Sequence, residues 1–177
     1  MNSESLHPIL CVAVVWIYDE PMNAELAQLA DGLGISRDEH RRFRLAFGLS
    51  CALRVKHSLE DQRALDALIA CQQYLDGQIG EAAFAVVAKD MLEVANSHGG
   101  SRSLDGAAHA AVSATYAVAQ AVNGRALEAA AYAAYASVYA YAGHAVTDPD
   151  AFAGEHAWQV ARFRELRELR EQPVPSA

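Results

Sequence analysis

The stretch AAHAAVSATYAVAQAVNGRALEAAAYAAYASVYAYAGHA, residues 107 to 145, decides the fold of this chain. It consists almost entirely of alanine, valine and tyrosine, contains no proline, and has Arg125 and Glu128 as its only charged residues. Alanine has the highest intrinsic helix propensity because it loses no side-chain entropy in a helix. The composition therefore predicts two helices, separated at Asn123-Gly124, that are too apolar to be solvated and that form the core of an all-α domain.

Tyrosines supply the volume that alanine lacks in this pair of helices. Tyr132, Tyr135 and Tyr139 have the spacing i, i+3, i+7 and so share one helical face, while Tyr116 lies in the preceding helix. An aromatic stripe at helical spacing is more typical of a core than of a ligand-binding box, which is the alternative. We also expect the small residues Ala133, Ala136 and Ala140 to be closely packed and intolerant of added bulk.

The composition is that of one globular domain, covering residues 1–177, with 53% hydrophobic and 20% charged residues. A net charge of −8 argues against nucleic acid or an anionic membrane surface as a partner. The three widely spaced cysteines, Cys11, Cys51 and Cys71, indicate free buried thiols in a reducing compartment. The apolar stretch 9–18 is too short for a membrane span and lacks the basic flank of a signal peptide, so we expect a cytoplasmic protein.

Helix signals predict about eight mostly antiparallel helices with short connections. A capping box of Ser36 and Glu39 begins one of them, Ser58 begins the next, and Asp148 with Pro149 begins the last. No run of alternating β-branched residues predicts a sheet. Besides the two alanine-rich helices, the expected helices cover approximately residues 8–18, 23–33, 36–57, 58–75, 80–96 and 148–171, and residues 1–5 and 172–177 are expected to fray.

Charge is distributed unevenly along the chain. Residues 1–40 carry seven acidic residues against Arg37 alone, whereas residues 41–57 carry five basic residues and no acidic one. Charge balancing between neighbouring helices is the simpler interpretation, and the alternative is an acidic face that recognises a basic partner. In that alternative the partner-binding residues are Asp19, Glu20, Glu25 and Asp31.

No combination of residues predicts catalysis or a cofactor. A single Glu-x-x-His, from Glu4 to His7, has no second copy, and the sequence has no glycine-rich phosphate loop and no Gly-x-Ser-x-Gly. His109, His144 and His156 could converge, which leaves open a helical-bundle enzyme or a metal-binding protein, but buried histidines with ordinary hydrogen-bond partners are the simpler interpretation. We therefore expect no catalytic residues, no metal and no cofactor.

Four segments resemble a family of bacterial immunity proteins over about residues 42–169. The segment Ser50-Cys51-Ala52-Leu53-Arg54-Val55 is similar to a Cys-Ala-x-Arg-Val helix of that family, and residues 61–67 and 74–79 to a following helix that ends in a Gly-x-Ile turn. Residues 155–166 are similar to the Ala-Trp-Gln-x-x-Arg-x-Arg-Glu-Leu ending of the family, which also has an alanine-rich region with tyrosines before it. The insertion at residues 97–104 and the first 36 residues depart from the family pattern.

The resemblance implies an all-α domain that protects its producer by binding a cognate protein toxin. The acidic face described above would suit a basic toxin. The family has no agreed catalytic residues, so the resemblance assigns none here. Two alternatives stay open: the histidine-based enzyme or metal-binding bundle, and a helical scaffold that simply oligomerises, for example as a homodimer.

Overall fold

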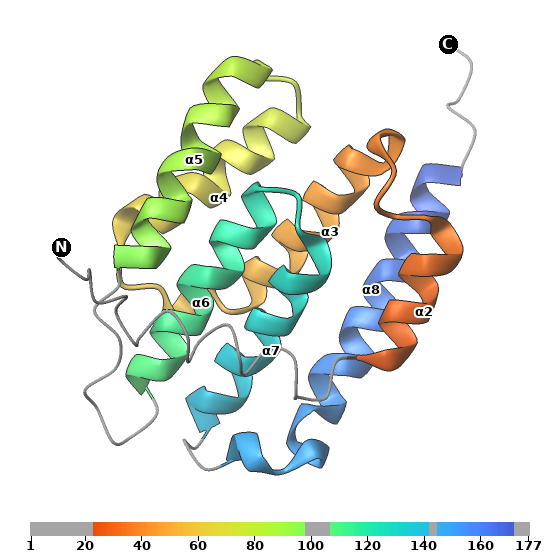
Figure 1. Ribbon diagram of the computed structural model, residues 1–177, viewed down its shortest axis with the longest axis vertical. Coiled ribbons are helices and arrows are strands. Elements are labelled where there is room, and N and C mark those ends of the chain that lie inside the picture. Colours follow the sequence, from red (N-terminus) through yellow and green to blue (C-terminus); the bar gives the residue numbers. More distant parts are fainter. Residues whose placement is uncertain (1–22, 98–106, 142–144, 172–177) are drawn as a thin grey trace, which may run out of the picture.

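The computed structural model describes residues 23–97, 107–141 and 145–171 (Figure 1). These segments hold seven α-helices and four short 3₁₀ helices, without a strand among them, which confirms the all-α prediction. The expected helix over residues 8–18 lies outside the described residues. The α-helices are α2 (Ala24–Leu33), α3 (Arg41–Arg54), α4 (Gln62–Leu75), α5 (Glu81–Ser97), α6 (Ala107–Val122), α7 (Ala126–Tyr141) and α8 (Ala153–Glu171). The 3₁₀ helices are η1 (Asp38–His40), η2 (Lys56–Ser58), η3 (Ala145–Thr147) and η4 (Pro149–Phe152).

The alanine-rich helices α6 and α7 form an antiparallel pair at the centre of the molecule (Figure 1). The chain reverses between them at Asn123-Gly124, where Gly124 has a φ of 71°, a conformation that only glycine adopts without strain. Ala133 and Ala136 have no exposed surface, as predicted. The prediction was wrong for Ala140, which is exposed. Because Tyr141 beside it is also 91% exposed, the last turn of α7 extends beyond the core.

Helix α3 packs against both members of this pair, and its closest approach is at Gly48. A Cβ atom placed on Gly48 would lie 3.0 Å from the Cα of Ala121 and 3.6 Å from the Cβ of Ala129. Glycine on one helix and alanine on the other two thus let three backbones approach closely. Two pairs of helices cover the flanks: α4 and α5 pack against α3 and α6, and α2 and α8 lie on the other side of α3 (Figure 1).

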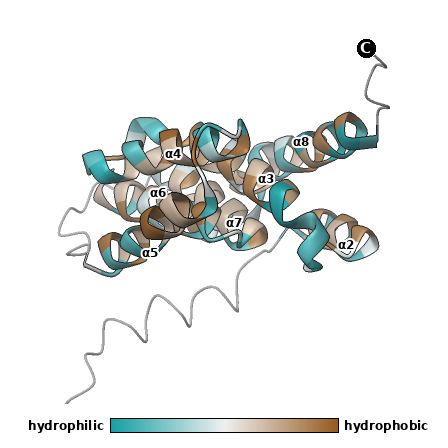
Figure 2. Cartoon of the chain, turned by 90° about the horizontal axis from the view of Figure 1, so that it is seen from above, coloured by the Kyte–Doolittle hydropathy of each residue, from teal (hydrophilic) through white to brown (hydrophobic). Residues whose placement is uncertain are grey.

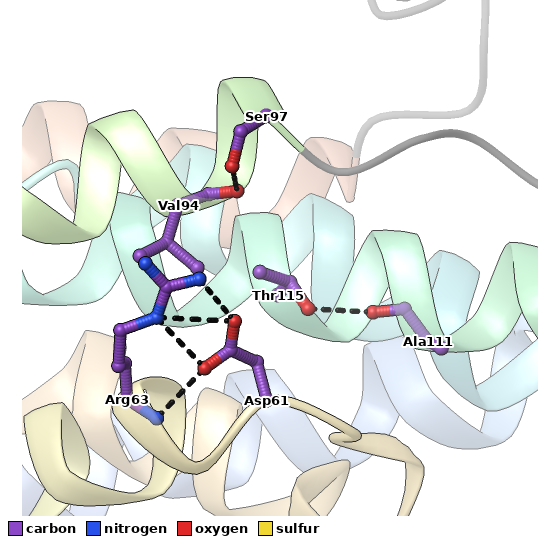
Figure 3. A network of polar contacts seen from close by, with 6 residues as sticks. All are labelled: Asp61, Arg63, Val94, Ser97, Ala111 and Thr115. Atoms are coloured by element: carbon purple, nitrogen blue, oxygen red, sulfur yellow. Dashed lines mark hydrogen bonds and ion pairs between the residues drawn. The ribbon is translucent and has the colours of Figure 1, made fainter.

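Apolar residues are concentrated at the centre and hydrophilic residues on the outer helices. In Figure 2, α6 and α7 show apolar to neutral colours along most of their length, whereas hydrophilic residues gather on α2, α4 and α8. The hydroxyl of the fully buried Thr115 donates to the backbone oxygen of Ala111, at 2.8 Å, so this core position leaves no orphan donor (Figure 3). None of the helices in the described segments is long and apolar enough to cross a membrane.

Two predicted helix starts were wrong, and at a third, Asp148 caps the 3₁₀ helix η4 before α8 begins at Ala153. Ser36 does not cap a helix: α3 begins at Arg41 after the short helix η1, and Arg44 donates to the carbonyl oxygens of Ile35 and Arg37 that end the preceding turn. The Arg44 side chain therefore provides hydrogen bonds to the backbone of this connection, where a capping box of Ser36 and Glu39 was expected.

Helix α4 likewise begins at Gln62 instead of Ser58. The side chain of Asp61 accepts a hydrogen bond from the backbone N–H of Arg63 at 2.9 Å, and it also pairs with the Arg63 guanidinium at 2.6 Å (Figure 3). An aspartate at the N-cap competes well with a serine upstream, and here it decides the boundary.

Charge balancing between neighbouring helices is confirmed for the basic helix α3. Arg41 forms two hydrogen bonds of 2.8 Å with the carboxylate of Glu81 on α5 and a third with the hydroxyl of Tyr74 on α4. Arg54 pairs with Glu155 on α8. The basic segment therefore contacts acidic residues on both flanks of the fold.

Candidate functional site

Five polar and aromatic side chains from α3 and α8 meet in one group, which we call the Arg54 cluster. Ser50 and Arg54 are one turn apart on α3, while Glu155, Trp158 and Arg162 have the spacing i, i+3, i+7 on α8. Each set shares one helical face, so the packing of α3 against α8 brings both faces together. Residues more than 100 positions apart in the sequence thus become neighbours.

The guanidinium of Arg54 is fixed by two contacts at its inner side. Its Nε donates to Oε2 of Glu155 at 2.8 Å, and its central carbon lies 4.2 Å from the centroid of the Trp158 ring. A planar cation stacked on an aromatic face and hydrogen-bonded to a carboxylate has little freedom to rotate. The two contacts therefore set the direction in which Arg54 presents its terminal nitrogens.

Burial divides the Arg54 cluster into an inner and an outer part. The Glu155 side chain is 5% exposed, whereas the Arg54 side chain is 39% exposed. The second carboxylate oxygen of Glu155, Oε1, is buried and has no hydrogen-bond partner among the described residues. A buried ion pair that is incompletely hydrogen-bonded adds little net stability, because desolvating the carboxylate offsets its attraction to the cation.

The outer side of the Arg54 cluster offers hydrogen-bond donors. Neither terminal nitrogen of Arg54, Nη1 or Nη2, has a partner within the part of the chain that the structure describes. Arg162 donates through Nε to the Ser50 hydroxyl at 3.2 Å and through Nη1 to Glu165 at 2.7 Å. Leu53, next to Arg54 in the chain, is 41% exposed. The surface thus combines guanidinium, indole and aliphatic groups.

Cys51 lies beside the Arg54 cluster but has no features of a nucleophile. Burial, and secondarily the charge of Glu155, raises the pKa of the Cys51 thiol well above its usual range. Burial also raises the pKa of Cys71 to about 12. Reactive cysteines require a lowered pKa. Both thiols are free and buried, as the sequence predicted, while Cys11 lies outside the described residues.

The predicted acidic partner-binding residues are only partly described. Asp19 and Glu20 lie outside the described residues, whereas Glu25 and Asp31 are both exposed on α2. Their separation of six positions places them on different sides of that helix. Glu25 pairs with Arg164 of α8 at 2.7 Å, so part of its charge is already balanced within the molecule.

The three candidate histidines do not form a described metal site. His109 is exposed and stacks on Tyr139, with ring centroids 5.1 Å apart, whereas His156 is half-buried and stacks on Phe152 at 5.7 Å. His144 lies outside the described residues. Among the residues that the structure describes, no three histidine, cysteine, aspartate or glutamate side chains are grouped closely enough to hold a metal ion.

The tyrosine stripe of α7 packs against neighbouring elements, as expected for a core. Tyr132 stacks on Tyr116 of α6 at 5.1 Å, and burial raises the pKa of Tyr132 to about 12. Tyr135 makes an edge contact with Phe152 of η4 at 5.4 Å. The stripe therefore links α7 to two different neighbours and is not gathered around one ligand site.

A second polar group ties α2 to the core through α8. The amide of Asn23 donates to the backbone oxygen of His156 at 2.9 Å and to the side-chain oxygen of Gln159 at 3.3 Å. Gln159, which is almost fully buried, donates in turn to the backbone oxygen of Ala130 at 2.9 Å. This chain of contacts holds α2, α8 and α7 in a fixed arrangement beside the Arg54 cluster.

Sequence reasoning did not identify the Arg54 cluster as a site. In the sequence, Arg54 is one of five basic residues at positions 41–57, and Glu155, Trp158 and Arg162 lie in a segment that is expected to be helical. The missed signal was the spacing: a buried-face glutamate, a tryptophan and an arginine at i, i+3, i+7 on one helix, and a lone arginine in the otherwise apolar second half of another. Nothing local, however, indicated that these two helices are in contact.

Comparisons with known proteins add no further guide to the function. No protein-family model, no curated protein and no solved structure matches this chain. Within the structure, the feature that bears on function is therefore the geometry of the Arg54 cluster.

Proposed function

We propose that this chain is a non-enzymatic, cytoplasmic immunity protein of a bacterium, which binds and neutralises a cognate protein toxin. The observation that carries the proposal is the contact between two of the segments that resemble the immunity proteins. Ser50 and Arg54 come from one segment and Glu155, Trp158 and Arg162 from the other, and all five meet in the Arg54 cluster. Of the five, Arg54, Trp158 and Arg162 stand at positions that the family patterns specify, so three of the similar residues meet at one surface site.

The chemistry of this surface suits protein recognition. Tryptophan and arginine are the residue types most enriched at the energetic centres of protein interfaces. Here an arginine is stacked on a tryptophan and remains 39% exposed. A binding role needs such a rigid, partly exposed anchor, and it needs no catalytic group.

The acidic residues are assigned a different role in the same proposal. Exposed charges at the rim of an interface chiefly raise the association rate and suppress wrong partners. With a net charge of −8, the chain would attract a basic toxin over a distance. We assign this steering to Asp19, Glu20, Glu25 and Asp31.

Co-expression tests the proposal directly. Each gene that flanks the coding sequence is expressed by itself in a bacterial host, and a product that arrests growth is then co-expressed with the intact chain. The expected result is restored growth and co-elution of the two proteins as one complex in size-exclusion chromatography. A copy of the chain carrying an early stop codon serves as the control.

The proposal is wrong if no flanking product arrests growth, or if growth arrest persists while the folded chain is present at equal amounts. Elemental analysis of the purified chain addresses the histidine-based alternative. Stoichiometric zinc or iron that is lost in His109→Ala or His144→Ala would favour a metal-binding protein in place of an immunity protein.

A further inference from the structure

We propose that the Arg54 cluster is the anchor of the partner interface and that it receives an acidic side chain, aspartate or glutamate, of the bound protein. This inference rests on the proposed function and adds to it the surface used and the chemistry recognised. It starts from one arginine whose inner side is fully occupied and whose outer side is open.

The Arg54 guanidinium is prepared for a second carboxylate. Glu155 occupies Nε and the Trp158 ring stacks against the guanidinium, while Nη1 and Nη2 have no hydrogen-bond partner among the described residues. An arginine edge with two parallel N–H donors matches the two oxygens of a carboxylate. Because the side chain is already immobilised, binding costs little further rotamer entropy.

The neighbours of Arg54 favour an acidic residue within a partly apolar segment. Arg162 lies one turn beyond Trp158 on α8 and has Nη2 unoccupied by any described residue. The indole of Trp158 supplies apolar surface against the Arg54 guanidinium, and Leu53, the residue before Arg54, is 41% exposed. A partner side chain that carries a carboxylate can therefore pair with Arg54 while an adjacent aliphatic residue covers Leu53.

The charge balance favours a protein carboxylate over a nucleic-acid phosphate. Arg54 and Arg162 are matched by Glu155 and Glu165 in the same group, so the surface offers directed N–H donors without an excess of positive charge. Nucleic-acid binding depends on releasing counterions with an excess of basic residues. The net charge of −8 opposes it further.

The first experiment measures binding of the toxic flanking product identified by co-expression. Arg54→Lys keeps a cation for Glu155 but removes the second pair of donors, so the dissociation rate constant should rise about tenfold or more while the association rate constant changes little. Arg63→Lys is the matched control, because Arg63 is an exposed arginine of α4 that pairs with Asp61 beside it. Thermal unfolding of both variants verifies that they fold.

Equal dissociation rates for the wild type, Arg54→Lys and Arg54→Gln would overturn the anchor while leaving the proposed function intact. A second experiment does not depend on the toxin. In a Trp16→Phe background Trp158 is the remaining indole, and its fluorescence reports occupation of the Arg54 cluster. We expect a saturable change with the peptide Glu-Glu-Leu-Glu-Glu, loss of that change in Arg54→Lys, and no response to Lys-Lys-Leu-Lys-Lys.

The peptide experiment separates failure of the anchor from failure of the proposed function. If no flanking product is toxic but the acidic peptide gives an Arg54-dependent response, the carboxylate site stands and the partner is a protein other than a toxin, bound through an acidic side chain. An absent response to the acidic peptide, or a tighter Arg54-dependent response to a short thymidine oligonucleotide than to the peptide, would overturn the inference.

Discussion

Arg54 and Glu155 form one ion pair, yet their removal should have unequal effects on stability. Glu155 is 5% exposed and accepts its hydrogen bond from Arg54, whereas Arg54 is 39% exposed and can be solvated by itself. Arg54→Met leaves a buried carboxylate without a counterion and should lower the free energy of unfolding by about 3 kcal/mol. Removing one partner of a buried ion pair typically costs about 3–5 kcal/mol, and the lower value applies here because the pair is partly solvated. Glu155→Gln should cost about 1 kcal/mol.

Urea unfolding of the two variants checks this asymmetry. In the double variant Arg54→Met/Glu155→Leu no buried charge remains, so most of the lost stability should return. Equal losses in the two single variants would mean that the carboxylate of Glu155 is well solvated, contrary to its position in the structure.

His156 should make the protein less stable in mild acid. Burial lowers the pKa of His156 below its ordinary value of about 6.5. As the pH falls through about 6.5, the unfolded state binds a proton before the folded state does, so the free energy of unfolding decreases until the pH reaches the lower folded-state pKa. In His156→Gln this contribution is absent, and the slope of stability against pH below 6.5 should be flatter. An unchanged slope in denaturant titrations across this range would contradict the burial of the imidazole.

At the scale of elements, Gly48 allows α3 to approach the alanine-rich pair closely. Gly48→Ala gains roughly 1 kcal/mol of helix propensity, but its Cβ would lie 3.0 Å from the Cα of Ala121. Backbone atoms cannot yield as a flexible side chain can, so overpacking should dominate and the net cost should be about 1–3 kcal/mol. Calorimetric melting temperatures measure the effect.

Gly154→Ala is the matched control for Gly48→Ala, because a Cβ atom at Gly154 of α8 meets nothing within 4 Å. That substitution should leave the protein as stable or slightly more stable. Stabilisation by Gly48→Ala alone would show that α3 is free to move away from α6.

Helix α7 has a packed part and a protruding end, and added bulk should distinguish them. Ala136 has no exposed surface, so Ala136→Leu should lower the free energy of unfolding by about 1–3 kcal/mol. Ala140 is exposed, and Ala140→Leu should change it by less than about 0.5 kcal/mol. Similar melting temperatures for both variants would mean that Ala136 does not face the core.

At the scale of the whole molecule, long-range charge and the anchor should affect different rate constants. Reversal of Asp19, Glu20 and Asp31 to lysine should slow association with the toxin and flatten its dependence on salt, while dissociation stays the same. Glu25 is left unchanged in this variant because it pairs with Arg164. Stopped-flow measurements at several salt concentrations provide the rates.

Reversal of Asp66, Asp90 and Glu93 on α4 and α5 changes the net charge by the same amount at another place and is the control for steering. If both triple variants associate equally fast, and as fast as the wild type at low salt, the N-terminal acidic residues do not steer the partner. If both are slowed equally, net charge alone acts, without a directed acidic face.

Local patterns in the sequence determined the helices and the identity of the core pair. Alanine propensity, the Asn123-Gly124 break and the apolar spacing of the other helices each act within a few turns, so they can be read from neighbouring residues. The residues at which helices begin were less predictable. The starts expected at Ser36 and Ser58 are displaced because the side chains of Arg44 and Asp61 bond the backbone in these connections. Of these two side chains, only Arg44 acts from outside the turn that it bonds, whereas Asp61 caps its own helix.

The tertiary structure alone decided which polar side chains meet. Arg164 has Glu168 one turn along its own helix, yet it contacts Glu25 across the α2–α8 interface. In the same way it is the packing of α3 against α8 that places Arg54 beside Glu155 and over Trp158. Such contacts depend on the position and rotation of whole helices, which small-residue packing at Gly48 helps to set, and no local pattern encodes them.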